Sequence, residues 1–259
     1  MPRFAANLTM MFNEVPFLER FARAAAAGFE AVEFLFPYEF PPEAVAEQLR
    51  RHGLALALFN LPPGDWAGGE RGIAALPGRE AEFRQGLATA RAYAEATGVR
   101  RVHMMAGLAA PDDAAAQARY EAGIREASAF FAPMGIDVLL EPLNRRDVPG
   151  YLLDDFGRAA AMIRRLGLPN VKLQFDIYHC QILHGDILMR LRDMFPIIGH
   201  IQTASIPLRN EPGSGELNDA AIFAELDRLG YAGFIGCEYR PANGTEAGLG
   251  WFAPYRPQR

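Results

Sequence analysis

The sequence predicts an α/β protein built as a closed barrel of eight parallel strands, each followed by helical structure. Apolar runs with strand character alternate with helical patterns from one end of the chain to the other. A length of 259 residues is typical of one such barrel. No Gly-rich dinucleotide-binding motif follows the first strand, which disfavours a doubly wound open sheet. Because no linker interrupts the alternation, residues 1–259 are expected to form a single domain.

Eight short apolar runs are the candidate strands, and each is bounded by turn residues or by a helical pattern. In chain order the candidate strands are Phe4–Leu8, Val32–Phe36, Leu54–Asn60, Arg101–Ala106, Asp137–Glu141, Val171–Asp176, Ile197–Gln202 and Phe234–Glu238.

The segments between these runs carry helical periodicity and the residues that start and stop helices. Pro42 suits the first turn of the second helix, and Gly53 and Gly98 suit the positions just after the second and third helices. The predicted helices lie near residues 14–27, 42–52, 79–97, 113–132, 155–166, 182–194 and 219–229.

The connection after the third strand, Leu61–Gly78, is unusually long. Connections of this length are often functional, and this one leaves the edge of the barrel where active sites lie. Trp66 and Arg71 stand among several glycines within it. We therefore expect a lid that covers a small ligand, with a purely structural Ω-loop as the alternative.

Composition limits the class of partner. Half of the residues are hydrophobic, 22% are charged, and the formal net charge is −5, which disfavours binding along a nucleic-acid backbone. The sequence shows no signal-peptide pattern and no apolar stretch near 20 residues, so neither secretion nor a membrane span is expected. Cys180 and Cys237 are expected to be free thiols in a reducing cytoplasm.

Four oxygen-bearing side chains end four successive strand candidates in the second half of the chain: Glu141, Asp176, Gln202 and Glu238. Parallel strands bring these ends to one edge of the barrel, where three carboxylates and an amide form a hard ligand set. Such a set prefers Mg²⁺ or Mn²⁺ to zinc. Acidic residues also follow strands simply because they enter polar loops, but four in succession favour a metal site.

Two of these residues are the candidate catalytic pair. Glu141 and Glu238 would stand on opposite sides of a bound substrate, as proton removal and return next to a carbonyl require. A metal between them would hold the substrate oxygens and stabilise an enediolate.

The substrate-binding candidates are His179, Arg209 and the lid residues Arg71 and Trp66. His179 follows Asp176 closely and either donates to a substrate oxygen or makes a hydrogen bond within its loop. Arg209 either reaches a substrate carboxylate or is a solvent-exposed loop residue. His200 lies one layer below Gln202, where a hydrogen-bonded core histidine is expected.

Several motifs resemble one family. They are Phe4–Phe12, Val32–Tyr38, Gly64–Gly72, Phe175–His179, His200–Gln202, Glu211–Glu216 and Gly236–Tyr239. Through them the chain resembles the hydroxypyruvate isomerase family, within the xylose-isomerase-like TIM barrels, over nearly its whole length. The resemblance implies an acid/base pair on Glu141 and Glu238, and metal positions on these two residues, Asp176 and Gln202. It also implies a homodimer as the expected assembly.

The expected reaction interconverts hydroxypyruvate and 2-hydroxy-3-oxopropanoate (tartronate semialdehyde). The alternative within the family is isomerisation of 2-oxo-tetronate, a four-carbon acid. Val102–Gly107 and Ala57–Asn60 look more like the tetronate enzymes, whereas Asp65–Arg71 and Asn144–Gly150 look more like hydroxypyruvate isomerase. The length of the acid therefore stays open. An anionic substrate near several carboxylates requires a cation, and Arg71 or Arg209 is expected to bind its carboxylate.

Other functions of related barrels fit less well. Ketose 3-epimerases, the second alternative, place a histidine where Gln202 stands. A zinc-dependent DNA-repair endonuclease needs additional metal-binding histidines and a basic surface, whereas this chain has five scattered histidines and is acidic. A non-catalytic binding protein on this scaffold would not need paired glutamates.

Overall fold

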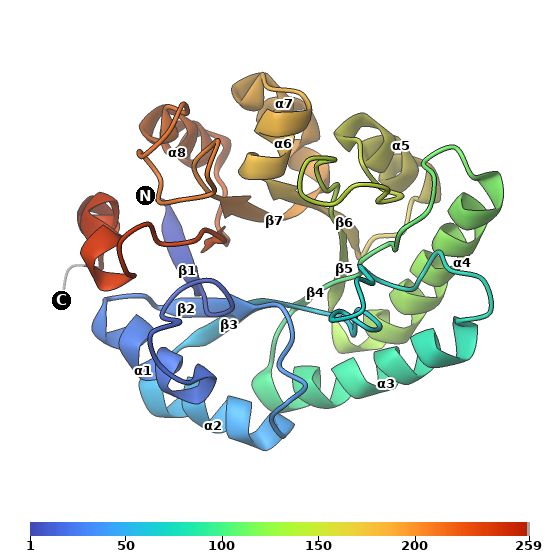
Figure 1. Ribbon diagram of the computed structural model, residues 1–259, viewed down its shortest axis with the longest axis horizontal. Helices are drawn as coiled ribbons and strands as arrows, with labels where there is room; N and C mark the ends of the chain where they lie inside the picture. The colour runs from blue at the N-terminus through green and yellow to red at the C-terminus, as the bar shows by residue number, and fades with distance from the viewer. Residues whose placement is uncertain (258–259) are drawn as a thin grey trace.

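A computed structural model describes residues 1–257 of the chain. Eight parallel strands pair in sequence order, and β1 pairs with both β2 and β8, so that the sheet closes into a barrel with helices around it (Figure 1). The predicted fold class is confirmed. The strands are β1 (Arg3–Asn7), β2 (Ala31–Phe34), β3 (Ala55–Asn60), β4 (Arg101–His103), β5 (Asp137–Leu140), β6 (Val171–Asp176), β7 (Ile198–Thr203) and β8 (Phe234–Cys237).

The helices agree with the sequence prediction except after β6. They are α1 (Phe17–Ala26), α2 (Pro42–His52), α3 (Glu80–Thr97), α4 (Ala114–Phe131), α5 (Phe156–Leu166), α6 (Ile177–Leu183), α7 (Ile187–Met194) and α8 (Asp219–Leu229). Three 3₁₀ helices cover Ala132–Met134, Phe195–Ile197 and Glu246–Tyr255.

The prediction of a single helix over 182–194 is wrong. Two helices stand there, and the break falls at Gly185 and Asp186, whose φ angles are both positive (66° and 53°). The first of the two, α6, begins directly after β6 because the Asp176 carboxylate accepts a hydrogen bond from the Tyr178 backbone N–H at 2.8 Å. This early start places Tyr178 and His179 on the first turn of a helix.

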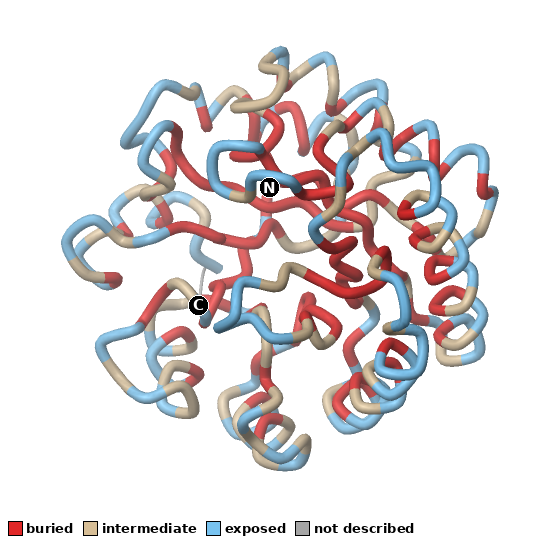
Figure 2. The backbone as a smooth tube through the Cα atoms, turned by 45° about the vertical axis from the view of Figure 1, so that its right-hand side comes forward, coloured by how far each residue is buried: buried red, intermediate tan, exposed pale blue. Residues whose placement is uncertain are grey.

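Helix α2 illustrates how the local sequence determines where a helix around the barrel begins and ends. Pro42 occupies the first turn of α2, and Gly53 ends the helix in a left-handed conformation (φ 64°) that suits glycine. Val45 and Leu49, four residues apart, form the buried face of the helix. This face is part of the apolar layer between barrel and helices, which Figure 2 shows as buried backbone inside an exposed outer ring.

The barrel interior changes character along its axis. Ala5, Ala31 and Ala57 form a small buried group within the barrel. Asn7 and Glu33 follow two residues later on β1 and β2, so they share a face with Ala5 and Ala31 and continue toward the carboxyl edge as buried polar groups. The polar site at this edge thus rests on an interior of small apolar residues.

No helix among residues 1–257 is long and apolar enough to cross a membrane.

Candidate active site

The carboxyl edge of the barrel surrounds a cavity of ≈450 Å³. All eight residues predicted for the site lie at this edge. Six line the cavity: Trp66, Arg71, Glu141, His179, Arg209 and Glu238. The other two, Asp176 and Gln202, are buried beside them at the ends of β6 and β7.

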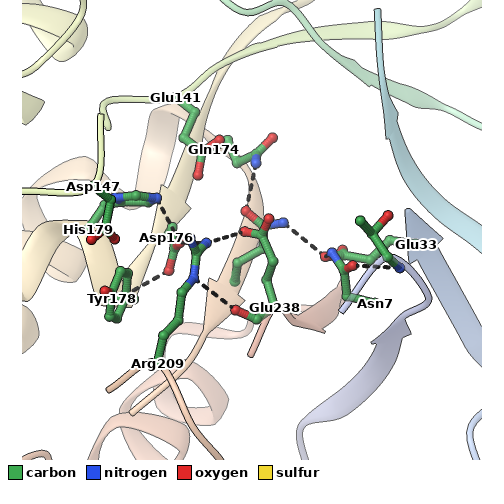
Figure 3. A network of polar contacts seen from close by, with 12 residues as sticks. Asn7, Glu33, Glu141, Asp147, Gln174, Asp176, Tyr178, His179, Arg209 and Glu238 are labelled. Carbon is green, nitrogen blue, oxygen red and sulfur yellow. Dashed lines mark hydrogen bonds and ion pairs between the residues drawn. The ribbon is translucent and has the colours of Figure 1, made fainter. Parts of the chain in front are cut away.

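Arg209 connects two of the three predicted carboxylates. Its Nη2 donates to Glu238 Oε2 at 2.9 Å and to Asp176 Oδ2 at 3.3 Å, and Figure 3 shows the guanidinium between them. Its Nε donates to the Glu238 backbone carbonyl at 3.2 Å. The Arg209 backbone is left-handed (φ 58°), which is uncommon outside glycine. The charge of Arg209 is therefore engaged by the protein's own carboxylates, and its predicted role as a substrate clamp stays a prediction.

Glu141 follows β5 directly and is the least satisfied of these carboxylates. Its Oε1 is buried and has no hydrogen-bond partner among residues 1–257. Its Oε2 lies 3.4 Å from Nδ1 of His103, a residue that also lines the cavity. A buried carboxylate oxygen without a donor is costly unless a proton, a cation or a ligand meets it.

Burial and mutual repulsion make these carboxylates poor acids. Burial raises the pKa of Glu238 to about 8, although the positive charge of Arg209 opposes the shift. Burial raises the pKa of Asp176 to about 6, again against the effect of Arg209. The pKa of Glu141 is raised well above its usual value by burial and by the charges of Glu238 and Asp176. Carboxyl groups with raised pKa values are suited to exchanging protons near neutral pH.

Below the carboxylates lies a buried hydrogen-bond network centred on Glu33. Glu33 Oε1 accepts from Asn7 Nδ2 at 2.9 Å and from Gln202 Nε2 at 2.8 Å, and Glu33 Oε2 lies 2.7 Å from His200 Nε2. His200 is thus a hydrogen-bonded core histidine, as predicted. The Gln202 side-chain oxygen accepts from Gln174 Nε2 at 2.6 Å and keeps a second lone pair.

Gly236 leaves the space that Glu33 fills. A Cβ atom at position 236 would lie 2.2 Å from Glu33 Oε2, a distance that such atoms do not adopt. The network therefore depends on the absence of a side chain at position 236 of β8.

His179 is held in one tautomer. The Asn144 backbone N–H donates to His179 Nδ1 at 3.0 Å, so the ring hydrogen is on Nε2. Glu141, Asp176 and His179 offer atoms within 4.8 Å of one another, the spacing of a metal site. However, Nε2 carries a hydrogen and lacks the free lone pair that a metal ligand needs. His179 is therefore suited to donating a hydrogen bond to a substrate oxygen.

The remaining oxygen donors fit a hard divalent cation. Glu141, Asp176 and Glu238 bring three carboxylates to one buried place, while Arg209 supplies one positive charge. Since Glu141 Oε1 has no partner and Gln202 has a free lone pair, these residues have oxygen atoms to give to Mg²⁺ or Mn²⁺.

The loop after β3 lies over the cavity. The Arg71 guanidinium stacks on the Trp66 ring, with 3.8 Å between its carbon and the ring centroid. Trp66 also lines a neighbouring hollow of ≈690 Å³, so its ring stands between the cavity and that hollow. At the base of the loop, Gly72 has a φ of 97° and packs so closely on the Met105 carbonyl that no side chain fits there. These contacts place Trp66 and Arg71 at the cavity, and the choice between a lid and a purely structural Ω-loop stays a prediction.

Sequence reasoning missed four residues of the site: Glu33, His103, Arg146 and Gln174. A signal existed for Glu33, because it is a charge inside the apolar run Val32–Phe34. His103 ends β4 in the way that Glu141 and Asp176 end their runs, but β4 was predicted to extend to Ala106. Arg146 lines the cavity and donates to the Tyr178 hydroxyl at 2.9 Å from a loop with no regular pattern.

Comparison with known proteins agrees with this geometry. The family model described as xylose isomerase-like TIM barrel matches residues 21–255. The chain belongs to this family. It is 54% identical over 257 residues to a 2-oxo-tetronate isomerase of Cupriavidus necator, with 98% of this chain and 99% of the relative covered. It is 43% identical over 258 residues to hydroxypyruvate isomerase of Escherichia coli, with 99% and 100% covered.

A solved structure from Brucella melitensis, described as an AP endonuclease of family 2, is also similar. It has a TM-score of 0.96 and 49% identity, and the match covers 99% of this chain and 100% of the other. Within the xylose isomerase-like barrels, the predicted membership of the hydroxypyruvate isomerase family is confirmed, and the protein is an isomerase.

Proposed function

We propose that this isomerase interconverts a 2-oxo-3-hydroxy acid and its 3-oxo-2-hydroxy isomer by proton transfer through an enediolate. The observation that carries the proposal is the pair Glu141 and Glu238, two buried carboxyl groups with raised pKa values in the wall of one cavity. Hydroxypyruvate, which yields 2-hydroxy-3-oxopropanoate, is the three-carbon member of this substrate class.

The substrate keeps its number of protons, while the two glutamates exchange protonation states and return to them by proton exchange with solvent before the next turnover in the same direction. One glutamate, as carboxylate, removes the proton from C3, and the electron pair forms a C2–C3 double bond while the C2 carbonyl oxygen takes up charge. The hydroxyl proton passes from the C3 oxygen to the C2 oxygen. The other glutamate, as carboxylic acid, returns a proton to C2, which leaves the carbonyl at C3. Two carboxyl groups that exchange protons with carbon must not both be ionised, which agrees with their raised pKa values.

A divalent ion held by Glu141, Asp176, Gln202 and Glu238 would supply positive charge beside the oxygens that become negative. His179 Nε2–H is a further donor toward this place. Arg209 keeps Glu238 oriented through contacts with both its side chain and its backbone.

The substrate carboxylate needs a cation that the protein's own carboxylates do not already bind. Arg71 and Arg240 line the cavity and form no ion pair within residues 1–257, whereas Arg146, which also lines it, has its Nε 3.7 Å from Asp147 Oδ1. A guanidinium binds a carboxylate bidentately, so the lid would close on an acid rather than on a neutral sugar.

A second candidate substrate is 2-oxo-tetronate, which carries a hydroxymethyl group on C3. The greater identity to a relative of that name, 54% against 43%, favours it. Steady-state kinetics on hydroxypyruvate, 2-oxo-tetronate and D-fructose, each with Mg²⁺ or Mn²⁺, test the proposal. A kcat/KM for one of the acids that exceeds the value for D-fructose at least tenfold supports it. A preference for D-fructose contradicts it.

A further inference from the structure

The cavity wall contains a buried histidine without a hydrogen bond. His103 is 1% exposed, and neither of its ring nitrogens has a partner within residues 1–257. It nevertheless lines the cavity, beside the similarly unpartnered Glu141 Oε1. Buried polar atoms almost always have partners, so unpartnered ring nitrogens on a residue that lines a cavity indicate a place that a ligand atom completes.

The position of His103 in the barrel explains why its ring faces a substrate. It is the last residue of β4 and pairs in register with Asn60, the last residue of β3, which lines the same cavity. On the other side, Nδ1 lies 3.4 Å from Glu141 Oε2. Nδ1 is therefore the ring nitrogen near the catalytic glutamate without being hydrogen-bonded to it, and Nε2 is the nitrogen left for another group.

We propose that His103 is a catalytic residue whose Nε2 hydrogen-bonds an oxygen on the reacting carbons of the substrate, next to Glu141. The inference rests on the proposed function for the identity of the substrate. As a donor to the C2 oxygen, the ring stabilises the negative charge that develops when a glutamate removes the C3 proton. The proton stays on the ring, so the balance of the isomerisation is unchanged. A neutral imidazole has the single donor that this role needs.

The test compares His103→Leu with His103→Gln, whose amide nitrogen approximates the position of Nε2. We expect His103→Leu to lower kcat about 100-fold, the effect of losing one donor to a developing oxyanion. We expect the kcat of His103→Gln to be at least tenfold higher than that of His103→Leu. Because His103 has no internal hydrogen bond to lose, His103→Leu is expected to keep or raise the Tm. A purely structural histidine would instead lower the Tm.

Thr203→Val is the matched control. The Thr203 hydroxyl is also buried and unpartnered, but Thr203 is absent from the cavity wall. Its removal is expected to leave kcat within twofold of wild type. Retention of more than half of wild-type kcat by His103→Leu would overturn the proposal. So would a His103→Gln variant no more active than His103→Leu.

A second measurement separates this proposal from the proposed function. The ¹⁵N spectrum of histidine-labelled protein with Mg²⁺ is recorded with hydroxypyruvate, 2-oxo-tetronate or D-fructose, and His103→Gln assigns the signal. A shift of His103 Nε2 on addition of an acid is expected. If only D-fructose shifts the signal, the role of His103 stands and the proposed acid substrate fails. If none of the three shifts it, Nε2 contacts no substrate and the proposal is overturned.

Discussion

The two sides of the cavity differ in whether their polar groups are hydrogen-bonded. On the side of β6 and β8, Asp176 and Glu238 are joined through Arg209, with a donor and an acceptor for each contact. On the side of β4 and β5, His103 and Glu141 Oε1 have no partner within residues 1–257. The bonded side is preorganised before substrate arrives, whereas the unbonded side is completed by something that enters the cavity. The proposed substrate contacts therefore lie on the side whose polar atoms lack partners within the protein.

The largest effect expected is loss of turnover when either glutamate loses its ability to carry a proton. Glu141→Gln and Glu238→Gln should each lower kcat by a factor of about 10² to 10⁴, the contribution of general acid–base catalysis. Similar losses of kcat in the two variants would show that Glu238, on the bonded side, and Glu141, on the unbonded side, both take part in proton transfer. Glu246→Gln, at an exposed ion pair with Arg23, is the control. A glutamine variant with more than half of wild-type kcat would remove that glutamate from the mechanism.

The bonded side should also make stability depend on pH. The Glu238 carboxyl ionises near pH 4.5 in the unfolded chain and near pH 8 in the folded protein. Between these values the unfolded chain releases a proton that the folded protein retains. The free energy of unfolding should therefore fall as pH rises from 4.5 to 8, by up to about 1.4 kcal/mol per pH unit from this group.

Urea unfolding of wild type and Glu238→Gln in a chelator, at pH 5 and pH 8, measures this contribution. We expect the variant to gain stability over wild type as the pH rises. Equal pH dependence of the two proteins would show that Arg209 keeps Glu238 ionised at neutral pH, and the contrast between the two sides would then be sharper still.

Metal binding distinguishes oxygen ligands from His179. Asp176→Asn should weaken Mn²⁺ binding by at least about 10- to 100-fold, because even groups that only orient metal ligands have effects of that size. His179→Leu should change the affinity by less than about threefold, since Nε2 of His179 carries a hydrogen and lies 3.5 Å from Asp176 Oδ2. Titration monitored by electron paramagnetic resonance gives both values. A large loss in His179→Leu would make the histidine a ligand and reverse the tautomer assigned to it.

The smallest effect expected concerns the lid. Arg71→Ala should raise KM for the acid substrate about tenfold with little change in kcat, since one charged hydrogen bond in a partly exposed place contributes roughly 1.5 kcal/mol. Arg146→Ala, on the opposite wall, is the comparison. If Arg146→Ala alone raises KM, the substrate carboxylate is bound near α6, and the predicted role of Arg71 is wrong.

The sequence predicted most of the fold because strand ends and helix ends leave local signals. Gly53 and the Pro41–Pro42 pair mark the limits of α2, and the apolar runs mark all eight strands. The early start of α6 was missed because Asp176 was assigned to metal binding alone. The same carboxylate also begins α6, and the sequence gives no sign that one side chain does both.

Within the site, the sequence predicted which strands contribute but not how the side chains pair. Arg209 was identified as a cation for the substrate, yet it contacts Glu238 and Asp176, which are 29 and 33 residues away along the chain. Contacts of this kind depend on the closure of the barrel and leave no local pattern. His103 gave no usable signal, since the property that defines it is an absent hydrogen bond, which only coordinates reveal.

Gly236 constrains how this enzyme can diverge. Because a side chain on β8 would occupy the space of the Glu33 carboxylate, substitutions at positions 33 and 236 are not independent. Alanine at position 236 requires the Glu33 carboxylate to shift or residue 33 to be shorter, and either change alters the hydrogen bonds of Asn7, Gln202 and His200. Substitution of one glycine is thereby tied to four other positions on three strands, and mutational tolerance in this network should be far lower than among Ala5, Ala31 and Ala57.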